Sequence, residues 1–251
     1  MAAEEVQECA AAAAPEAATE APTAETGGPA AAADGLGPAP HFTCDFEETP
    51  EGNFIWNASR VLLRYLQAPE RARTIRGRRV LELGSGLGHL GHGLARLGAH
   101  VTCTDQAKGL PTLEASLQEL DGQHGTAAAA GGSIRAVELD WGEDGLAGSQ
   151  LGAEAAAGEG SARYYDIIIS AELVYLEETH DLLLWTWGWL CGPETVVYSV
   201  FVNRPFSWAF FAKLHDLGEF EVEQIEEGKD FDPCGMEEVH MHRVTRLRPV
   251  A

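Results

Sequence analysis

The sequence predicts an α/β fold with a doubly wound sheet of seven strands, mostly parallel and ending in a C-terminal antiparallel hairpin. Strand-like and helix-like segments alternate along the chain, as they do where helices cross between parallel strands. The first predicted strand runs directly into a glycine-rich turn. The 251 residues, 45% of them hydrophobic, are enough for one full-sized domain and too few for two comfortable ones.

Seven segments have the length and the β-branched or aromatic content of strands: Arg79–Leu83, His100–Thr104, Ser133–Glu138, Tyr165–Ile169, Thr195–Val202, Phe220–Ile225 and Val239–Leu247. Apolar residues recur at three- and four-residue intervals in five others, which predicts helices: Ala58–Leu66, Leu90–Leu97, Leu110–Leu120, Asp181–Leu190 and Ser207–Leu217. The last two strands have a short connection without a clear helical run, so we expect them to form the hairpin.

The N-terminal arm, residues 1–40, has a different composition. It holds sixteen alanines and seven acids, and it has no Lys, Arg, Ile, Phe, Trp or Tyr. Proline and glycine interrupt every candidate helical turn, so the arm is predicted to be disordered. Residues 42–251 then form the folded domain. Two Ala- and Gly-rich stretches within it, near 122–132 and 142–161, are predicted to be loop insertions.

Charge and cysteine content exclude several classes of protein. The formal charge is −22, of which the arm carries −7, and this acid excess disfavours nucleic-acid binding. No apolar run is long enough for a membrane span, and the N-terminus is acidic where a targeting peptide would be basic. The five cysteines contain no CxxC pair, and His240 and His242 have no third ligand partner. We expect a monomeric cytoplasmic protein with no metal site.

The strongest local signal is the glycine loop within Val80–Gly88. A buried strand breaks into Gly84, Ser85, Gly86, Leu87 and Gly88 and resumes as a helix, so the backbone can closely approach a ligand. A dinucleotide fingerprint needs its third glycine at the sixth position, which here is His89. An NAD enzyme is therefore disfavoured, and a tight turn without a ligand stays as an alternative.

The second predicted strand ends in Asp105, about twenty residues beyond the glycine loop. An acid at this spacing binds ribose hydroxyls in nucleotide-binding α/β folds. A carboxylate can accept hydrogen bonds from both hydroxyls, and adjacent strand ends place it at the same sheet edge as the loop. The alternative is a surface acid that caps the next helix.

The glycine loop, preceded by an acid on its strand, resembles motif I of the class I methyltransferases, which have a Rossmann-like sheet. Three further segments resemble a single group within that class: Phe54–Ser59, Leu139–Gly142 and Ala171–Tyr175. They look like the seven-β-strand protein-lysine methyltransferases of methyltransferase family 16. The resemblance runs from about Phe54 to the C-terminus, and Tyr175–Thr179 is especially similar to the chaperone-modifying branch.

This resemblance implies an enzyme that transfers a methyl group from S-adenosylmethionine to a lysine of a chaperone-like or elongation-factor-like protein. It also implies roles in cofactor binding. Trp56 would help to close the cofactor pocket, Gly84, Ser85 and Gly86 would line the methionine end, Asp105 would bind the ribose, Trp141 would lie along the adenine, and Ala171 would contact the cofactor at a strand end. Core packing is the alternative for both tryptophans.

The catalytic pair implied by the resemblance is Glu172 and Tyr175, an acid-x-x-aromatic motif just past a strand's carboxyl end. The acid is Glu where the family more often has Asp. Because a carboxylate favours the charged ammonium form of lysine, Glu172 is assigned to substrate capture and Tyr175 to orientation of the nitrogen. A methyltransferase for arginine, histidine or a small molecule stays open, as does an inactive cofactor-binding regulatory subunit.

Overall fold

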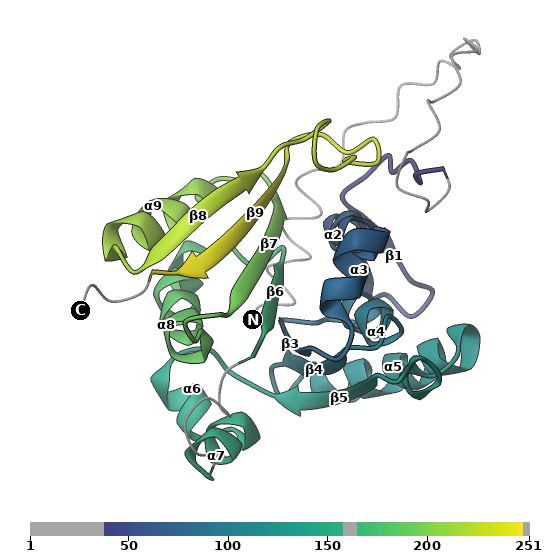
Figure 1. The fold of residues 1–251 in the computed structure, drawn as a ribbon, viewed down its shortest axis with the longest axis horizontal. Coiled ribbons are helices and arrows are strands. Elements are labelled where there is room, and N and C mark those ends of the chain that lie inside the picture. Colours follow the sequence, from purple (N-terminus) through teal and green to yellow (C-terminus); the bar gives the residue numbers. More distant parts are fainter. Residues whose placement is uncertain (1–37, 158–164, 248–251) are drawn as a thin grey trace. The chain divides into compact units, whose positions relative to one another are not determined.

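A seven-stranded sheet with helices on both faces forms the domain (Figure 1). The structure is a computed structural model that describes residues 38–157 and 165–247. In spatial order the strands are β5 (Ser133–Glu138), β4 (His100–Asp105), β3 (Arg79–Leu83), β6 (Ile167–Ala171), β7 (Val196–Val202), β9 (Val239–Arg246) and β8 (Phe220–Ile225). Strand β9 is antiparallel to both its neighbours, and the other strand pairs are parallel. The predicted fold class is confirmed.

The order in which strands join the sheet reverses between β3 and β6. The chain first builds outward from β3 to β4 and β5, then returns to place β6 on the free side of β3, where Val80 pairs with Ile167. Helices diverge from the sheet at such a switch point. In open α/β sheets, the crevice beyond the carboxyl ends of the two strands at such a point is where ligands bind.

Two layers of helices bury the two faces of the sheet. One layer contains α2 (Asn57–Gln67), α3 (Pro69–Ile75), α4 (His89–Ala95) and α5 (Leu110–His124). The other contains α6 (Glu143–Ala147), α7 (Gln150–Ala157), α8 (His180–Leu190) and α9 (Ser207–Leu217). The five predicted helices are all present, with ends that differ by no more than four residues.

Alternation along the strands distributes side chains between the two layers. Val80 packs toward α2 and α4, whereas Leu81 and Leu83 pack toward α8. The second layer centres on Trp187, which is fully buried with its ring 5.1 Å from that of Phe210. Each such side chain contributes roughly 1.5–3 kcal/mol by leaving water.

Several short elements were not predicted. Strands β1 (Phe46–Glu48) and β2 (Phe54–Trp56) form a small antiparallel sheet of their own, and three residues are too few to show a period. The two predicted loop insertions differ from the structure. The first contains the end of α5 and a 3-10 turn, η1 (Ala127–Ala130), and the second contains α6 and α7.

The helices in these stretches have a simple cause. Alanine, which has the highest helix propensity, supplies half of α7, and Glu143 and Asp144 favour the N-terminus of α6. One buried leucine in each short helix, Leu146 in α6 and Leu151 in α7, attaches it to the core. The Ala- and Gly-rich composition led to the prediction of loops, although each of these two helices contains a leucine that is buried in the fold. The rest of the second stretch, residues 158–161, lies outside the described residues, as does the predicted disordered arm up to residue 37.

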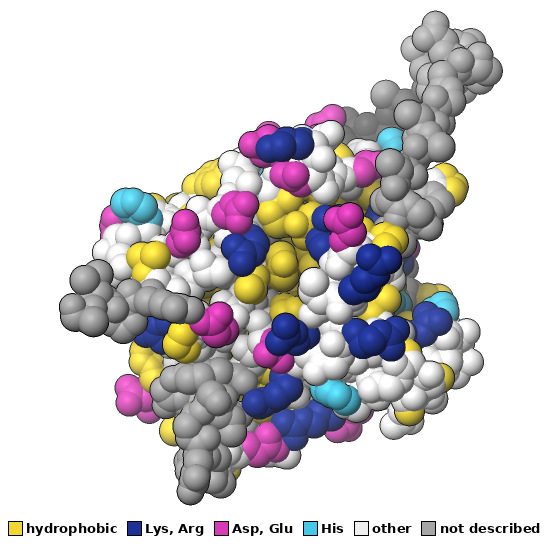
Figure 2. All heavy atoms as spheres, viewed as in Figure 1, with side chains coloured by type: hydrophobic (Ala, Val, Ile, Leu, Met, Phe, Trp, Pro, Cys, Tyr) yellow, Lys and Arg dark blue, Asp and Glu magenta, His cyan; other side chains and the backbone are white. Residues whose placement is uncertain are grey.

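The surface carries both signs of charge. On the face shown in Figure 2, Lys and Arg side chains are interspersed with Asp and Glu, so the acid excess is not gathered into one patch on that face. Within the described part of the chain, no helix has both the length and the hydrophobicity that crossing a membrane requires.

Candidate active site

The glycine loop lies at the carboxyl end of β3, beside the switch point. Gly84, Gly86 and Gly88 have φ values of +56°, +54° and +72°, a left-handed conformation that residues with a Cβ rarely adopt. A Cβ on Gly84 would lie 2.6 Å from Cδ2 of Leu173, but a Cβ on Gly86 would meet no atom within 4 Å. The backbone at Gly86 therefore faces open space, as a loop that cradles a ligand requires.

Hydrogen bonds attach this loop to the end of β4. The Ser85 amide donates to the Thr104 carbonyl at 2.8 Å, and the Thr104 amide donates to Ser85 Oγ at 3.0 Å. The Gly86 amide donates to Asp105 Oδ2 at 2.9 Å, and the Gln106 amide donates to Oδ1 at 2.8 Å. Burial raises the pKa of Asp105, and these two hydrogen bonds lower it. The structure thus brings the predicted ribose ligand onto the predicted methionine loop.

Glu82, in the strand that leads into the glycine loop, connects the elements around the loop. Its Oε2 accepts hydrogen bonds from the Gly91 amide at 3.1 Å and from Cys103 Sγ at 3.3 Å, so it ties β3 to both α4 and β4. The side chain is buried, and burial raises its pKa to about 7. Glu82 therefore stabilises the loop from inside the core.

Trp141 and Ala171 flank the glycine loop. Trp141 follows β5 and is half-buried, with Cζ2 3.6 Å from the place that a Cβ on Gly84 would occupy. Ala171 is the last residue of β6, paired with Val200 of β7 and half-buried. Both predicted cofactor ligands lie at the same edge of the sheet as the loop.

Glu172 is held in an unusual backbone conformation. Its φ is +56°, which costs a residue with a side chain about 1 kcal/mol or more. Its amide donates to the Val200 carbonyl at 2.9 Å, and its Oε1 accepts a hydrogen bond from the Val202 amide, also at 2.9 Å. The side chain is only 5% exposed, so burial raises its pKa to about 7, against the opposing effects of Arg204 and the Val202 amide.

Arg204 connects Glu172 to the N-terminal part of the domain. Its Nη2 lies 3.5 Å from Glu172 Oε2 and 3.3 Å from Asp45 Oδ2. Its guanidinium carbon lies 5.3 Å from the ring centre of Trp56, whose other ring neighbour, Phe46, is also at 5.3 Å. Trp56 is half-buried at the end of β2, just before α2, and contacts Arg204, as the glutamate does.

The sequence predicts the positions of Arg204 and Asp45 to different degrees. The sequence places Arg204 two residues after the predicted strand Thr195–Val202, and so at the carboxyl edge of the sheet, but it does not indicate a contact with Glu172. Asp45 belongs to no motif, and its approach to Arg204, 159 residues away, depends on the tertiary fold.

Tyr175, the second predicted catalytic residue, is half-buried between β6 and η3 (Glu177–Thr179). The segment is fixed by His180, whose Nε2 lies 3.0 Å from the Val174 carbonyl oxygen. Leu173 lies against Gly84 of the glycine loop. The four-residue motif therefore passes directly along the loop.

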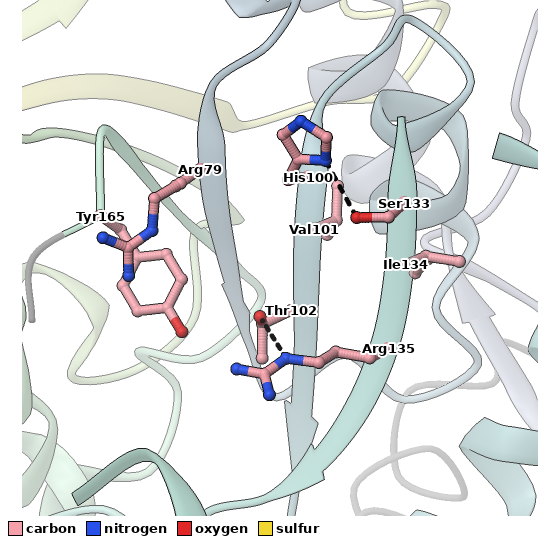
Figure 3. Close-up of a pocket in the computed structure, with 8 residues that line it drawn as sticks. All are labelled: Arg79, His100, Val101, Thr102, Ser133, Ile134, Arg135 and Tyr165. Atoms are coloured by element: carbon pink, nitrogen blue, oxygen red, sulfur yellow. Dashed lines mark hydrogen bonds between the residues drawn. The ribbon is translucent and has the colours of Figure 1, made fainter. Parts of the chain in front are cut away.

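A pocket of about 310 Å³ lies at the opposite edge, where the parallel strands begin (Figure 3). Its polar lining includes Arg79, His100, Ser133 and Arg135. The His100 and Ser133 side chains are hydrogen-bonded to each other, and Arg135 binds both carboxylate oxygens of Glu154 at 2.7 and 2.6 Å. The predicted site residues on the strand ends and the glycine loop lie at the other edge.

Two features define a class I methyltransferase. One is the doubly wound sheet, in which β9, next to the β8 edge, is antiparallel to its neighbours. The other is the glycine loop beside the switch point, hydrogen-bonded to the acid at the end of β4. The residues fit the methyl donor, because the loop backbone is open and Asp105 is oriented beside it. The chain belongs to the lysine methyltransferase family, which matches residues 45–216.

Two relatives with the same activity in their names agree with this assignment. EEF1A lysine methyltransferase 3 of Xenopus tropicalis is 28% identical over 196 residues, which cover 77% of this chain and 75% of that protein. Protein N-lysine methyltransferase METTL21A of Danio rerio is 36% identical over 143 residues, 57% of each chain. A solved TehB-like methyltransferase from Corynebacterium glutamicum is 21% identical, with a TM-score of 0.49, and the match covers 79% of this chain and 91% of that one.

The predicted activity, methylation of a protein lysine with S-adenosylmethionine as the methyl donor, is thereby confirmed.

Proposed function

We propose that the methyl acceptor is a lysine of an elongation-factor-like or chaperone-like protein, and that it enters the site beside Glu172. The observation that carries this proposal is the position of Glu172, immediately after Ala171 at the switch-point crevice and three residues before Tyr175. The name of the Xenopus relative, which specifies EEF1A, supports the substrate class.

We assign the binding of the methyl donor to the residues at the loop. Gly84, Ser85 and Gly86 offer backbone to its methionine end, Asp105 offers a carboxylate to its ribose, and Trp141 offers an aromatic face to its adenine. Trp56 closes the site on the acceptor side, and the small Ala171 leaves space beside the reacting atoms. When bound, S-adenosylmethionine supplies an electrophilic methyl group.

The acceptor must lose a proton before it can act as a nucleophile. A lysine with the ordinary pKa of about 10.4 is neutral about one part in a thousand near pH 7.4, which costs roughly 4 kcal/mol. A carboxylate does not reduce this cost, so Glu172 captures and orients the side chain. Tyr175 shapes the channel and directs the nitrogen. Alignment of the reacting atoms provides the main gain, a proximity effect of several kcal/mol.

The direct test is incubation of the full chain with labelled S-adenosylmethionine and purified EEF1A, with a cell lysate in parallel, followed by mass spectrometry of each labelled band. A methylated lysine on EEF1A or on another protein of the proposed class supports the proposal. Label on arginine, histidine or small molecules alone contradicts it.

Replacement of the aromatic residue tests the assigned roles. Tyr175→Phe should reduce methylation about tenfold, because the ring remains while the hydroxyl that orients the nitrogen is lost. Binding of S-adenosylhomocysteine, measured by calorimetry, should stay within about twofold of the parent. A parallel loss of binding would place Tyr175 in the cofactor site instead.

We further propose that the enzyme acts as a cytoplasmic monomer without a nucleic-acid partner. The acidic composition and the absence of a CxxC pair support this. A measured mass of a dimer in solution, or association with ribosomal RNA, would contradict it.

A further inference from the structure

Arg204 contacts three groups of the proposed acceptor site at once: the carboxylates of Glu172 and Asp45 and the ring of Trp56. The turn that carries it is tightly specified. The Arg204 amide donates to Ser207 Oγ at 3.1 Å, and Phe206 has a left-handed φ of +74°. Strain of this kind persists only where surrounding contacts enforce it. The turn is therefore fixed, and the contacts with Glu172, Asp45 and Trp56 hold the guanidinium at the site.

The contact between Arg204 and Glu172 is long, so it leaves hydrogen-bond acceptor positions on the Glu172 carboxylate for a substrate. Glu172 Oε1 already accepts the Val202 amide, whereas Oε2 has the Arg204 nitrogen at 3.5 Å, longer than a charge-assisted hydrogen bond. A carboxylate has about four acceptor positions. Oε2 can therefore accept a hydrogen bond from an incoming amine while Arg204 stays in place.

The charges around Glu172 explain why an arginine is needed here. A carboxylate that is 5% exposed tends to take up a proton, and a protonated Glu172 would lose acceptor capacity. Asp45, the other charged group facing it, adds to that tendency, and Arg204 opposes both effects. An unbalanced carboxylate would also hold the lysine in its charged form. Arg204 offsets this attraction as well.

We propose that Arg204 is a positioning residue for the methyl acceptor, whose guanidinium keeps Glu172 ionised and oriented while balancing its negative charge beside the incoming amine. This inference rests on the proposed role of Glu172 in acceptor binding. It assigns Arg204 no contact with the reacting atoms. Its effect on the reaction passes entirely through Glu172.

The first test compares rates of EEF1A methylation by full-length Arg204→Gln and the parent between pH 6.5 and 9. Without the guanidinium, Glu172 ionises only at higher pH, so the variant should be at least about fivefold slower near pH 7 and should approach the parent rate by pH 9. Deprotonation of the substrate lysine affects both enzymes alike and cancels in this ratio. A ratio that does not change with pH would mean a structural role only and would overturn the proposal.

Two further variants separate charge from packing. Arg204→Lys keeps the positive charge and should recover most of the rate that Arg204→Gln loses near pH 7, because the effect on the ionisation of Glu172 depends on charge. Arg78→Gln removes an equal charge at the opposite edge, where Arg78 pairs with Asp166, and should leave the profile unchanged. A lysine variant as slow as the glutamine variant at every pH contradicts the proposal. Thermal melting and binding of S-adenosylhomocysteine verify that each variant is folded.

The second readout needs no methyl acceptor. Infrared difference spectra against Glu172→Gln identify the carboxyl band of Glu172, and its pH titration gives the midpoint directly. In Arg204→Gln the midpoint should rise by about one pH unit or more. An unchanged midpoint overturns the inference even if methylation falls. Absence of methylation by the parent enzyme, with a shifted midpoint, instead contradicts the proposed function and leaves the Arg204–Glu172 coupling established.

Discussion

Two glutamate–arginine pairs at opposite edges of the sheet behave in opposite ways. At the amino edge, Arg135 binds both carboxylate oxygens of Glu154, which is 43% exposed, and the arginine lowers its pKa to about 2. At the carboxyl edge, Arg204 lies 3.5 Å from Glu172, and burial raises the glutamate's pKa to about 7. An arginine partner thus accompanies a lowered pKa in Glu154 and a raised pKa in Glu172, because desolvation and contact geometry decide the sign of the shift.

Backbone strain differs between the edges as well. Among the described residues, four other than glycine have a positive φ. Three of them, Glu172, Phe206 and Glu238, lie where β6 and β7 end and where the antiparallel β9 begins. Strain and a buried acid thus coincide at the edge to which we assign the chemistry. The amino edge has exposed, closely paired charges that stabilise the surface.

The largest expected effect follows from neutralising each glutamate. Glu172→Gln should slow methylation by about 10³-fold, because the neutral amide cannot capture the ammonium and binds the amine weakly. Glu154→Gln should change the rate by less than about twofold. Initial rates at saturating S-adenosylmethionine check both variants.

Calorimetric binding of S-adenosylhomocysteine is the control for this pair and should be nearly equal in the parent and both variants. If Glu154→Gln proved as damaging as Glu172→Gln, the amino edge would have a role in the reaction, and the assignment of chemistry to one edge would be wrong.

The second effect concerns how folding stability varies with pH. Glu82 is buried, and its pKa of about 7 lies above the value of about 4.3 expected in the unfolded chain. Between these two values the folded state holds a proton that the unfolded state lacks, so the glutamate's contribution to stability is lost as pH rises from about 4.5 to about 7. The loss is at most about 4 kcal/mol.

Denaturant unfolding of Glu82→Gln and the parent at several pH values measures this contribution. The free-energy difference between them should move in favour of the variant as pH rises through this window and stay constant above it. Subtraction is necessary because buried histidines with lowered pKa values, such as His242, have the opposite pH dependence. A difference that is constant from pH 4.5 to 8 would show that Glu82 is ionised throughout. For Glu154→Gln the free-energy difference from the parent should be constant above about pH 4.5 and should shrink as pH falls from about 4.5 to about 2.

The comparison also shows what local sequence can reveal. The main strands and helices follow from the hydrophobic pattern, because β3, β4 and β6 are buried on both faces and read as largely apolar runs. The glycine loop and Asp105 could be placed together because their spacing reflects adjacent strand ends. Such features depend on residues near one another in the sequence.

The remaining features depend on contacts between distant segments. No local pattern indicates that Asp45 approaches Arg204, or that Arg204 approaches Glu172, since these pairs form only when β1, β6 and β7 are assembled. The helices α6 and α7 were missed for a different reason, since a single buried leucine anchors each short helix. Sequence therefore predicts which edge is active, and the folded chain determines the charge state of its acid.

The smallest effect contrasts the two aspartates that accept backbone amides at strand ends. Asp105 accepts the amides of Gly86 and Gln106 at the carboxyl edge, and Asp166 accepts the amide of Arg79 at the amino edge. Asp105→Asn leaves one acceptor oxygen for two amides and two ribose hydroxyls, so binding of S-adenosylhomocysteine should weaken about tenfold, or about 1.4 kcal/mol.

Asp166→Asn should change that affinity by less than about twofold, although it too loses a carboxylate beside a backbone amide. Binding calorimetry and thermal melting of both variants separate ligand binding from support of the glycine loop. If Asp105 only supports the loop, the variant protein should unfold at a lower temperature. Equal affinity in Asp105→Asn and the parent would leave Asp105 a structural link between β4 and the glycine loop. In that case the two edges would differ in their glutamates, Glu172 and Glu154, but not in their aspartates. The ribose would then need another partner.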